Sequence, residues 1–450
     1  MTSGLSVAVI GAGAAGLAAA RDLARAGCRV QVYESEERVG GLAAGFRDEG
    51  WDWHLEKFYH HWFESDRHVL ALIDEMGLAD RVLFPRPRTA YRIDGRNYRA
   101  EISPSALLLP LSLSASLRLG LTGLRLKLTR DWRQLEKVTA HDWLMRNMGR
   151  EAYERLWQPL LIGKFSERYR EVNMAWLWAR VVSRSLRLGT FEGGFQAFLD
   201  VLAADCRRHG ATIRCNTRVQ RILRQETGLA LQVAGAAPQR FDRVLGTTSP
   251  RLMLRLCEGL AASDYGRQLA ALESIGAVCV VLALKQSLLQ DGTYWLNLPA
   301  TSPDRERSSF PFLALVEHTN WIDRRHYNGD VLVYCGDYVP PDHAWFQLEE
   351  AQLVRRFCAV LGRFNPDFRA DQVRRAWVFR APYAQPVPGI NHSAKVPPLQ
   401  TPWPGLFMAN MSQVYPWDRG TNHAIELGRR VARMMLDATR PVGPRRSVID

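Results

Sequence analysis

The stretch Ser6-Val-Ala-Val-Ile-Gly11-Ala-Gly13-Ala-Ala-Gly16 joins an apolar strand pattern directly to a Gly-x-Gly-x-x-Gly turn. An Ala- and Leu-rich helical pattern follows to about residue 26, and a second apolar run covers residues 29–33. In such a unit the first glycine permits the tight turn, the second lets a diphosphate approach the backbone, and the third allows close packing of helix on strand. The stretch therefore predicts a β-α-β unit whose helix N-terminus binds a dinucleotide.

A carboxylate stands where this prediction needs one. Glu34 closes the second strand, 18 residues after Gly16, where it can accept hydrogen bonds from the ribose hydroxyls. Its charge would repel a 2′-phosphate, so we do not expect NADP as the ligand of this unit. The alternative is purely structural, with a solvated glutamate following a glycine-rich turn.

A second glycine motif follows in Arg38-Val-Gly40-Gly41. The order of strand, Gly-x-Gly-x-x-Gly, acidic residue and Arg-x-Gly-Gly resembles the N-terminal signature of the FAD-dependent amine oxidase, protoporphyrinogen oxidase and phytoene desaturase superfamily. The resemblance continues at Asn216-Thr-Arg-Val219, and residues 415–428 resemble the family's C-terminal flavin segment. It implies non-covalent FAD, because residues 418–422 hold no cysteine or histidine where monoamine oxidases carry their covalent cysteine.

The cofactor contacts that the resemblance implies lie in three parts of the chain. They are Gly11, Gly13, Ala14, Ala15, Gly16, Glu34, Ser35, Arg38, Gly40, Gly41, Leu42, Val219, Asn410, Asp418, Gly420, Thr421, Asn422 and Ala424. The expected fold is α/β, with a discontinuous Rossmann-type FAD-binding domain formed by residues 1–75, 190–260 and 396–440. Residues 76–189 and 261–395 are expected to form a substrate-binding domain of antiparallel sheet plus helices.

An aromatic segment at residues 51–63 follows the second glycine motif, where the chain of this superfamily passes near the flavin. Its rings could line an apolar cavity, and Tyr59, His60 and His61 are the candidate catalytic residues, since imidazoles exchange protons near neutral pH. The alternative is that the paired histidines are structural. Without a spaced carboxylate they make a poor metal site, so we expect no metal. Candidate substrate contacts are Trp53, Phe58, Trp62, Tyr383, Gln385, Tyr415 and Trp417.

Two departures from the amine oxidase pattern bear on the reaction. The lysine that holds a water against the flavin in that branch corresponds to Val280, and a cage tyrosine corresponds to Gly420. The resemblance therefore favours an apolar substrate that loses hydride without a dedicated base, although Lys285 leaves room for a misalignment. Residues 157–165 are a further candidate wall segment, and Glu56 is expected to form a structural ion pair.

The composition is that of a globular protein, with 47% hydrophobic and 23% charged residues, and it excludes disordered, collagenous and coiled-coil classes. The formal net charge of +13 favours anions such as nucleotides, phosphates or acidic lipid surfaces, and we expect no nucleic-acid partner. Seven cysteines without a Cys-x-x-Cys motif, and an N-terminus without a basic leader, indicate a cytoplasmic protein.

Residues 104–130 form the most apolar part of the chain. Leucines recur there at helical spacing from Leu117 to Leu128, while Arg118 and Arg125 follow the same rhythm on another face. A core-facing helix of the substrate domain fits this pattern, and so does an interfacial membrane helix. The second alternative would make the protein peripherally membrane-associated.

Together these observations favour an FAD-dependent oxidoreductase of the oxidase or desaturase type. It would oxidise or desaturate a largely apolar substrate, such as an isoprenoid or lipid-linked one, by hydride transfer to flavin N5, with oxygen or a quinone as oxidant. Three alternatives stay open. They are an amine or amino-acid oxidase, a flavoenzyme without net redox chemistry like the UDP-galactopyranose mutases, and a non-catalytic flavin-binding partner subunit.

Overall fold

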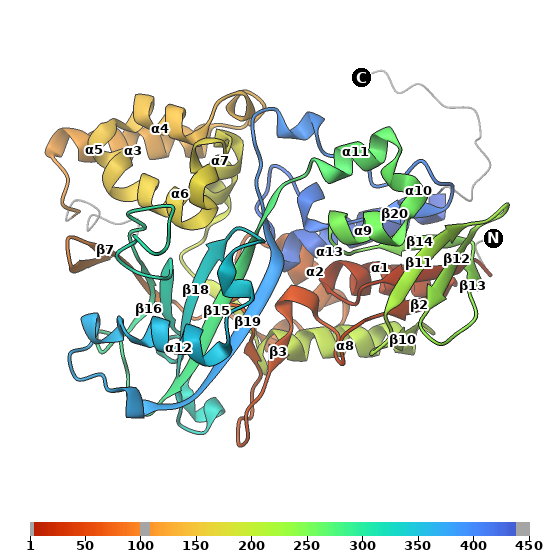
Figure 1. Ribbon diagram of the computed structural model, residues 1–450, viewed down its shortest axis with the longest axis horizontal. Helices are drawn as coiled ribbons and strands as arrows, with labels where there is room; N and C mark the ends of the chain where they lie inside the picture. Colours follow the sequence, from red (N-terminus) through yellow and green to blue (C-terminus); the bar gives the residue numbers. More distant parts are fainter. Residues whose placement is uncertain (1–3, 100–108, 438–450) are drawn as a thin grey trace.

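The computed structural model describes residues 4–99 and 109–437, so the leucines at 107 and 108 and the end of the expected cofactor domain lie outside the described residues. A parallel five-stranded sheet, in the order β10-β2-β1-β14-β20, occupies the right of Figure 1. Its strands are β1 (Ser6–Ile10), β2 (Arg29–Tyr33), β10 (Thr212–Arg214), β14 (Arg243–Gly246) and β20 (Leu406–Met408). Three distant parts of the chain therefore contribute to one sheet.

Both faces of this parallel sheet are covered. Helices α1 (Ala14–Arg25), α2 (Arg67–Glu75), α8 (Gly194–Arg208) and α13 (Thr421–Asp437) share one apolar cluster with one face. The other face packs on a small antiparallel sheet and three short helices. These elements are β11 (Val219–Arg224), β12 (Leu229–Val233), β13 (Gln239–Phe241), α9 (Pro250–Leu256), α10 (Glu258–Ala261) and α11 (Asp264–Ala270). Because both faces are buried, β1 is apolar from Val7 to Ile10 instead of alternating.

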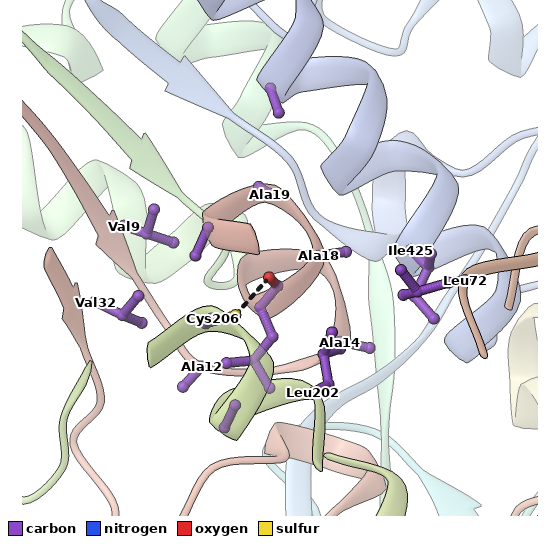
Figure 2. Packing of buried hydrophobic residues seen from close by; sticks show 14 of the residues in the cluster. Val9, Ala12, Ala14, Ala18, Ala19, Val32, Leu72, Leu202, Cys206 and Ile425 are labelled. Atoms are coloured by element: carbon purple, nitrogen blue, oxygen red, sulfur yellow. Dashed lines mark hydrogen bonds between the residues drawn. The ribbon is translucent and has the colours of Figure 1, made fainter. Parts of the chain in front are cut away.

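Helix α1 approaches its neighbours closely because its sequence is rich in alanine and glycine. Figure 2 shows Ala18 and Ala19 of α1 together with Cys206 of α8 and Ile425 of α13. The Cys206 thiol donates to the Leu17 carbonyl at 3.3 Å. A Cβ added at Gly428 of α13 would lie 2.1 Å from the Ala15 carbonyl oxygen. The first turn of α1 and the first half of α13 are thus held in contact, which positions both for a shared ligand.

A second sheet of seven strands has the order β19-β15-β18-β17-β16-β7-β8 and is antiparallel except between β16 and β7. Its strands are β7 (Arg88–Ile93), β8 (Arg96–Arg99), β15 (Ser274–Leu284), β16 (Thr293–Asn297), β17 (Ala314–Glu317), β18 (Val331–Val339) and β19 (Val373–Pro386). Helix α12 (Glu350–Cys358) packs on its lower side in Figure 1. The short strands β3 (Gly45–Phe46), β4 (Leu55–Glu56), β5 (Trp62–Phe63), β6 (Val82–Leu83) and β9 (Leu188–Phe191) lie apart from both large sheets.

A helical layer forms the upper left of Figure 1 and packs on one end of the seven-stranded sheet. It comprises α3 (Leu113–Leu128), α4 (Ala140–Met148), α5 (Arg150–Ala152), α6 (Gln158–Phe165) and α7 (Met174–Ser183). In the described parts of the chain, no helix has the length and hydropathy that a membrane span requires.

The architecture confirms the expected α/β class with a parallel sheet and a second, largely antiparallel sheet. Tyr383 and Gln385, two of the candidate substrate contacts, lie near the end of the long strand β19. This strand lies at the edge of its sheet, where a proline such as Pro382 removes no hydrogen bond to a further strand.

Candidate active site

The glycine turn between β1 and α1 forms a cradle of backbone. Gly11 has φ +101°, and a Cβ at Gly16 would lie 2.0 Å from the Gly11 carbonyl oxygen, so only glycine fits there. Gly13 pairs with Gly40, and the Gly40 amide donates to the Ala12 carbonyl at 2.9 Å. The two glycine motifs therefore meet at the start of α1, whose first residues are Ala14 and Ala15 and whose N-terminal amides favour an anion.

Glu34 is tied to this cradle. Its Oε2 accepts the Ala12 amide at 2.8 Å, and its Oε1 accepts the Glu36 amide at 3.1 Å and the Ser35 hydroxyl at 3.3 Å. The backbone of Glu34 also accepts the Thr217 amide at 2.7 Å. Because Thr217 lies two residues before buried Val219, the structure brings the predicted adenosine contacts together at one corner of the parallel sheet.

The rest of the second glycine motif is more open. The Arg38 guanidinium is about half exposed and lies 3.5 Å from the His54 ring. Leu42 is 38% exposed. These side chains border the Gly13–Gly40 contact and are free to approach a ligand there.

The first residues of α13 supply side chains with quite different roles. Thr421 accepts a hydrogen bond from the Trp62 indole at 2.7 Å. Asn422 Oδ1 accepts the backbone amides of His68 at 2.9 Å and Val69 at 3.1 Å, so it caps the start of α2 from outside. Its side-chain oxygen is thereby occupied. A Cβ at Gly420 would meet open space, and the Ala424 amide closes the first turn of α13 on the Gly420 carbonyl at 2.9 Å.

Asn410 follows β20 and is 4% exposed. Its Oδ1 accepts the Ser412 amide at 2.9 Å and the Tyr383 hydroxyl at 3.1 Å. Its Nδ2 is buried without a hydrogen-bond partner. A buried amide donor that lacks a partner costs free energy, so it marks a place where a polar ligand atom would bind favourably.

Asp418 is engaged by cations instead of being free for a cofactor. It forms ion pairs with Lys164 of α6, at 3.7 Å, and with Arg180 of α7, and it accepts the Trp176 indole at 3.1 Å. These positive charges hold the pKa of the Asp418 carboxyl well below its ordinary value in spite of burial, which acts in the opposite direction. The next residue, Arg419, donates to the Ala384 carbonyl and the Tyr338 hydroxyl.

The candidate catalytic residues of the segment at 58–61 lie beside the seven-stranded sheet. Tyr59 packs edge-on against Trp295 at 4.7 Å between ring centroids, and a Cβ at Gly336 would lie 2.6 Å from its ring. His60 Nδ1 donates to the Phe58 carbonyl at 2.6 Å, and His61 Nδ1 is buried without a partner. Tyr59 and His61 thus lie beside Trp295 of β16, whereas His60 lies near Phe195 of α8.

Both histidines have pKa values far from neutrality. Burial lowers the pKa of His60 to about 4, and burial together with the charge of Arg184 lowers that of His61 to about 3. Neither imidazole titrates near neutral pH, contrary to the expectation from sequence. Burial likewise raises the pKa of Tyr59 well above its ordinary value. All three groups are neutral around pH 7, so the local chemistry offers hydrogen-bonding groups and no poised base.

The predicted substrate contacts divide into two groups. Trp62 was wrongly placed among them, because its side chain is fully buried between Phe195 and Phe198 in the cofactor-side core. Trp53 stacks on His326 with centroids 4.1 Å apart. The remaining candidates lie around the junction of the two large sheets and the helical layer. They are Phe58, Tyr383, Gln385, Tyr415 and Trp417.

A narrow cavity lies at this junction. Gln385, Tyr415 and Trp417 line it together with Trp176 and Arg419. Gln385 is buried, its Nε2 donates to the Pro386 carbonyl at 2.9 Å, and its Oε1 has no partner. The cavity therefore combines aromatic walls with an unsatisfied polar acceptor.

The alignment of the amine oxidase lysine with Val280 places that position on the wrong face of β15. Val280 packs in the cluster behind the sheet, whereas Cys279 and Val281 face the aromatic segment. Lys285 is exposed at the end of the strand. Strand β15 reads Ser-Ile-Gly-Ala-Val-Cys-Val-Val-Leu-Ala-Leu, so it presents no amine on either face.

Glu56 differs from its expected role as an ion-pair partner. Its carboxylate is buried, accepts the Phe195 amide at 2.8 Å, and forms no ion pair with any described cation. Burial raises its pKa to about 7. The residue therefore supports the N-terminus of α8 as a group that is partly protonated near neutral pH.

Sequence reasoning missed a group of cations beside these residues, namely Lys164, Arg180, Arg184 and Arg419. Lys164 lay in a candidate wall segment, but the charges on α6, on and after α7, and before α13 are separated by up to 255 positions. No local pattern brings them together, and only the tertiary fold reveals the group.

The family model described as flavin containing amine oxidoreductase matches residues 14–436. A 15-cis-phytoene desaturase from Synechococcus elongatus is 31% identical over 31% of this chain, and the match spans about a third of that relative, 32% of its length. Coproporphyrinogen III oxidase from Staphylococcus aureus is 22% identical over 94% of this chain and 95% of its own length. Cyclohexylamine oxidase from Brevibacterium oxydans has a similar fold, with a TM-score of 0.71 and 17% identity over 96% of this chain and 99% of its own.

The family match covers nearly the whole chain, including the second glycine motif and the segment before α13. This family match agrees with the geometry of the glycine motifs described above. The chain therefore belongs to the flavin-containing amine oxidoreductases, as the glycine motifs predicted.

Proposed function

We propose that the protein binds FAD non-covalently and oxidises or desaturates a largely apolar substrate, such as an isoprenoid or lipid-linked molecule. A bound flavin would supply the acceptor for a hydride from the substrate. The observation that carries this proposal is the composition of the candidate site. Aromatic rings and neutral histidines surround it, and β15 presents no lysine to orient an amine.

Two features of this chain fit FAD. The backbone at Gly13 and Gly40 forms a cradle at the N-terminus of α1, and a Cβ at Gly40 would lie only 2.8 Å from the Ala44 Cα. The buried Nδ2 of Asn410 lacks a partner that a polar flavin atom would provide. Glu34 and Val219 would hold the adenosine half of FAD. Arg38 and Gly41 would contact the diphosphate, and the segment from Gly420 to Ala424 would hold the flavin end.

The protein's own residues would bind and orient the substrate while excluding water. Tyr59, His60 and Phe58 would form an apolar wall between the two large sheets. His60 donates from Nδ1 to the Phe58 carbonyl, so its Nε2 is an acceptor directed away from that bond. Because both histidines are neutral, we assign them to positioning the substrate and not to removing a proton. In this proposal residues 76–189 and 261–395 form the substrate domain.

Anaerobic reduction of the bound flavin tests the proposed reaction. Isoprenoid lipids, amines and nucleotide-sugars are added separately to the purified protein, and flavin absorbance is followed. Bleaching by the lipids and not by amines is the expected result. Bleaching by amines alone would establish the amine oxidase alternative instead. A reaction of a nucleotide-sugar without net bleaching would identify mutase-like chemistry, and an inert flavin under all conditions would indicate a non-catalytic subunit.

We also propose that the substrate is taken from a membrane surface through α3. Leucines at 113, 117, 121, 124 and 128 are between 55% and 74% exposed, so this face is directed to solvent and not to the core. The opposite side of α3, with Ala115, Thr122 and Leu126, is buried against the helical layer. Lys127 and Arg130 add exposed positive charge beside the leucines. Such a face fits the interface of an anionic bilayer.

Co-sedimentation with anionic vesicles tests this contact. Replacing Leu117 and Leu121 by serine removes two of the exposed leucines, each of which contributes about 1 kcal/mol on insertion, so vesicle affinity should fall about 30-fold. Lys127→Gln with Arg130→Gln should weaken binding at low salt and make the remaining binding less sensitive to salt. Leu83→Ser alters a comparable leucine, 37% exposed on β6, and serves as the control. Equal sedimentation of all variants would exclude membrane docking through α3.

A further inference from the structure

Four basic side chains converge where α6, α7 and the start of α13 meet the seven-stranded sheet. Lys164 lies near the end of α6 and Arg180 near the end of α7, while Arg184 directly follows α7 and Arg419 directly precedes the segment that opens α13. The Lys164 ammonium lies over the Trp176 ring at 5.5 Å and the Tyr338 ring at 5.1 Å. We refer to Lys164, Arg180, Arg184 and Arg419 as the cation cluster.

The cation cluster carries more positive charge than its protein neighbours neutralise. Asp418 pairs with Lys164 and Arg180, and the described residues contain no second carboxylate in an ion pair with any member. Asp337, another buried carboxylate of this sheet, is bound by Arg305 through both of its oxygens. Four formal positive charges therefore face one negative charge. Charges removed from water without a partner are costly, so this arrangement favours the binding of an anion.

Arg184 is the member that is free to bind. Its guanidinium has no hydrogen-bond or ion-pair partner among the described residues, and its side chain is accessible to solvent. Burial, and then the charge of Arg180, nevertheless lower its pKa to about 10. Burial also lowers the pKa of Lys164 well below its ordinary value, and the neighbouring guanidinium of Arg180 adds to this effect.

The cation cluster borders the candidate site and not the dinucleotide cradle. The charges of Arg184 and Arg180 reach His61, and that of Arg419 reaches His60. Asp418, Arg419 and Trp176 line the narrow cavity at the junction of the sheets. The glycine cradle, in contrast, is formed at the N-terminus of α1 by the first and second glycine motifs. A ligand of the cation cluster would thus be bound at the substrate end of the molecule.

We propose that the cation cluster binds an anionic group of the substrate, a phosphate or a carboxylate, with Arg184 as the principal contact. The inference rests on the proposed function and narrows its substrate from an apolar molecule to an amphiphile with an anionic end. A guanidinium binds both oxyanions through two parallel hydrogen bonds, and Lys164 adds a point charge. The aromatic wall at Phe58 and Tyr59 would then contact the apolar part.

Isothermal titration calorimetry of the FAD-saturated protein tests this assignment without turnover. Inorganic pyrophosphate and succinate are the two probes, and the one that binds more tightly identifies phosphate or carboxylate as the preferred group. Arg184→Gln should weaken that probe about 10- to 100-fold, which is the range for losing a charge-assisted hydrogen bond. Arg187→Gln removes an equal charge three residues away, from another exposed side chain, and should change the affinity less than twofold.

Absence of binding by the wild type, or equal affinities of the two variants, would overturn the inference. Retention of the flavin absorbance spectrum and of the melting temperature in Arg184→Gln shows that the fold persists. The binding heat does not depend on catalysis, so anion binding without flavin reduction by any lipid would contradict the proposed function alone. Equal flavin reduction by neutral and anionic lipids, unchanged in Arg184→Gln, would contradict the inference alone.

Discussion

Replacement of Glu34 by alanine should weaken flavin binding through two separable effects. The Glu34 carboxylate accepts the amides of Ala12 and Glu36, at 2.8 and 3.1 Å, and the residue is 7% exposed. Its removal leaves the buried Ala12 amide without a partner, at a cost of about 1–3 kcal/mol in the free energy of unfolding. It also removes the acceptor for the ribose hydroxyls, which we expect to lower FAD affinity about 10- to 100-fold.

The two effects are measured independently. Urea unfolding of the flavin-free protein gives the loss of stability, and fluorescence titration with FAD gives the loss of affinity. Glu37→Ala is the matched control, since it removes the same charge three residues along from a side chain that is 81% exposed. An unchanged dissociation constant for FAD in Glu34→Ala would show that the adenosine half binds elsewhere, even if the protein were less stable.

Three further outcomes follow from other contacts. Burial raises the pKa of Glu56 to about 7, so the stability due to its neutral form is complete below about pH 4.5 and is lost as the pH rises through 7. Glu56→Gln should therefore gain up to about 3 kcal/mol over wild type between pH 5 and pH 8 in denaturant titrations, whereas a constant difference would contradict the assignment. Asn422→Ala should lose about 1–2 kcal/mol in thermal unfolding by uncapping α2, and Asn422→Asp should restore most of it. Acid precipitation should release all flavin into the supernatant, and flavin that remains in the pellet would indicate a covalent bond.

The cofactor half of the site was predictable because its signals are local. A tight turn, a close diphosphate approach and a carboxylate on the next strand fall within 24 residues of each other, from Gly11 to Glu34. Each requires a specific residue type, and the fold brings them together through one β-α-β unit. The positions of Thr217 and Val219 were predictable for the same reason. These residues lie close to Glu34 because β10 pairs with β2.

The substrate half was less predictable because burial and distant charges decide it. The sequence predicts that a histidine pair titrates near neutral pH. Desolvation and the guanidinium of Arg184 instead lower the pKa of His61, so this residue is neutral. From the sequence, Trp62 was expected to line a cavity. The pairing of β5 with β9 instead directs its side chain into the core. Successive side chains of β15 point to opposite faces of the sheet. An alignment error of one residue therefore exchanges Cys279, which faces the site, for Val280, which does not.

The cation cluster also bears on how hydride could leave a substrate in a site without a base. Loss of hydride leaves positive charge on the carbon that is oxidised, and an excess of nearby cations opposes that charge. A neutral substrate would leave the excess positive charge of the cluster unchanged, so the cluster would oppose the loss of hydride with its full charge. A substrate whose anionic end pairs with Arg184 and Lys164 would neutralise part of the cluster before the reaction starts, so binding of the anion and ease of hydride loss would be coupled. The charge excess would then select amphiphilic substrates in the chemical step as well as in binding.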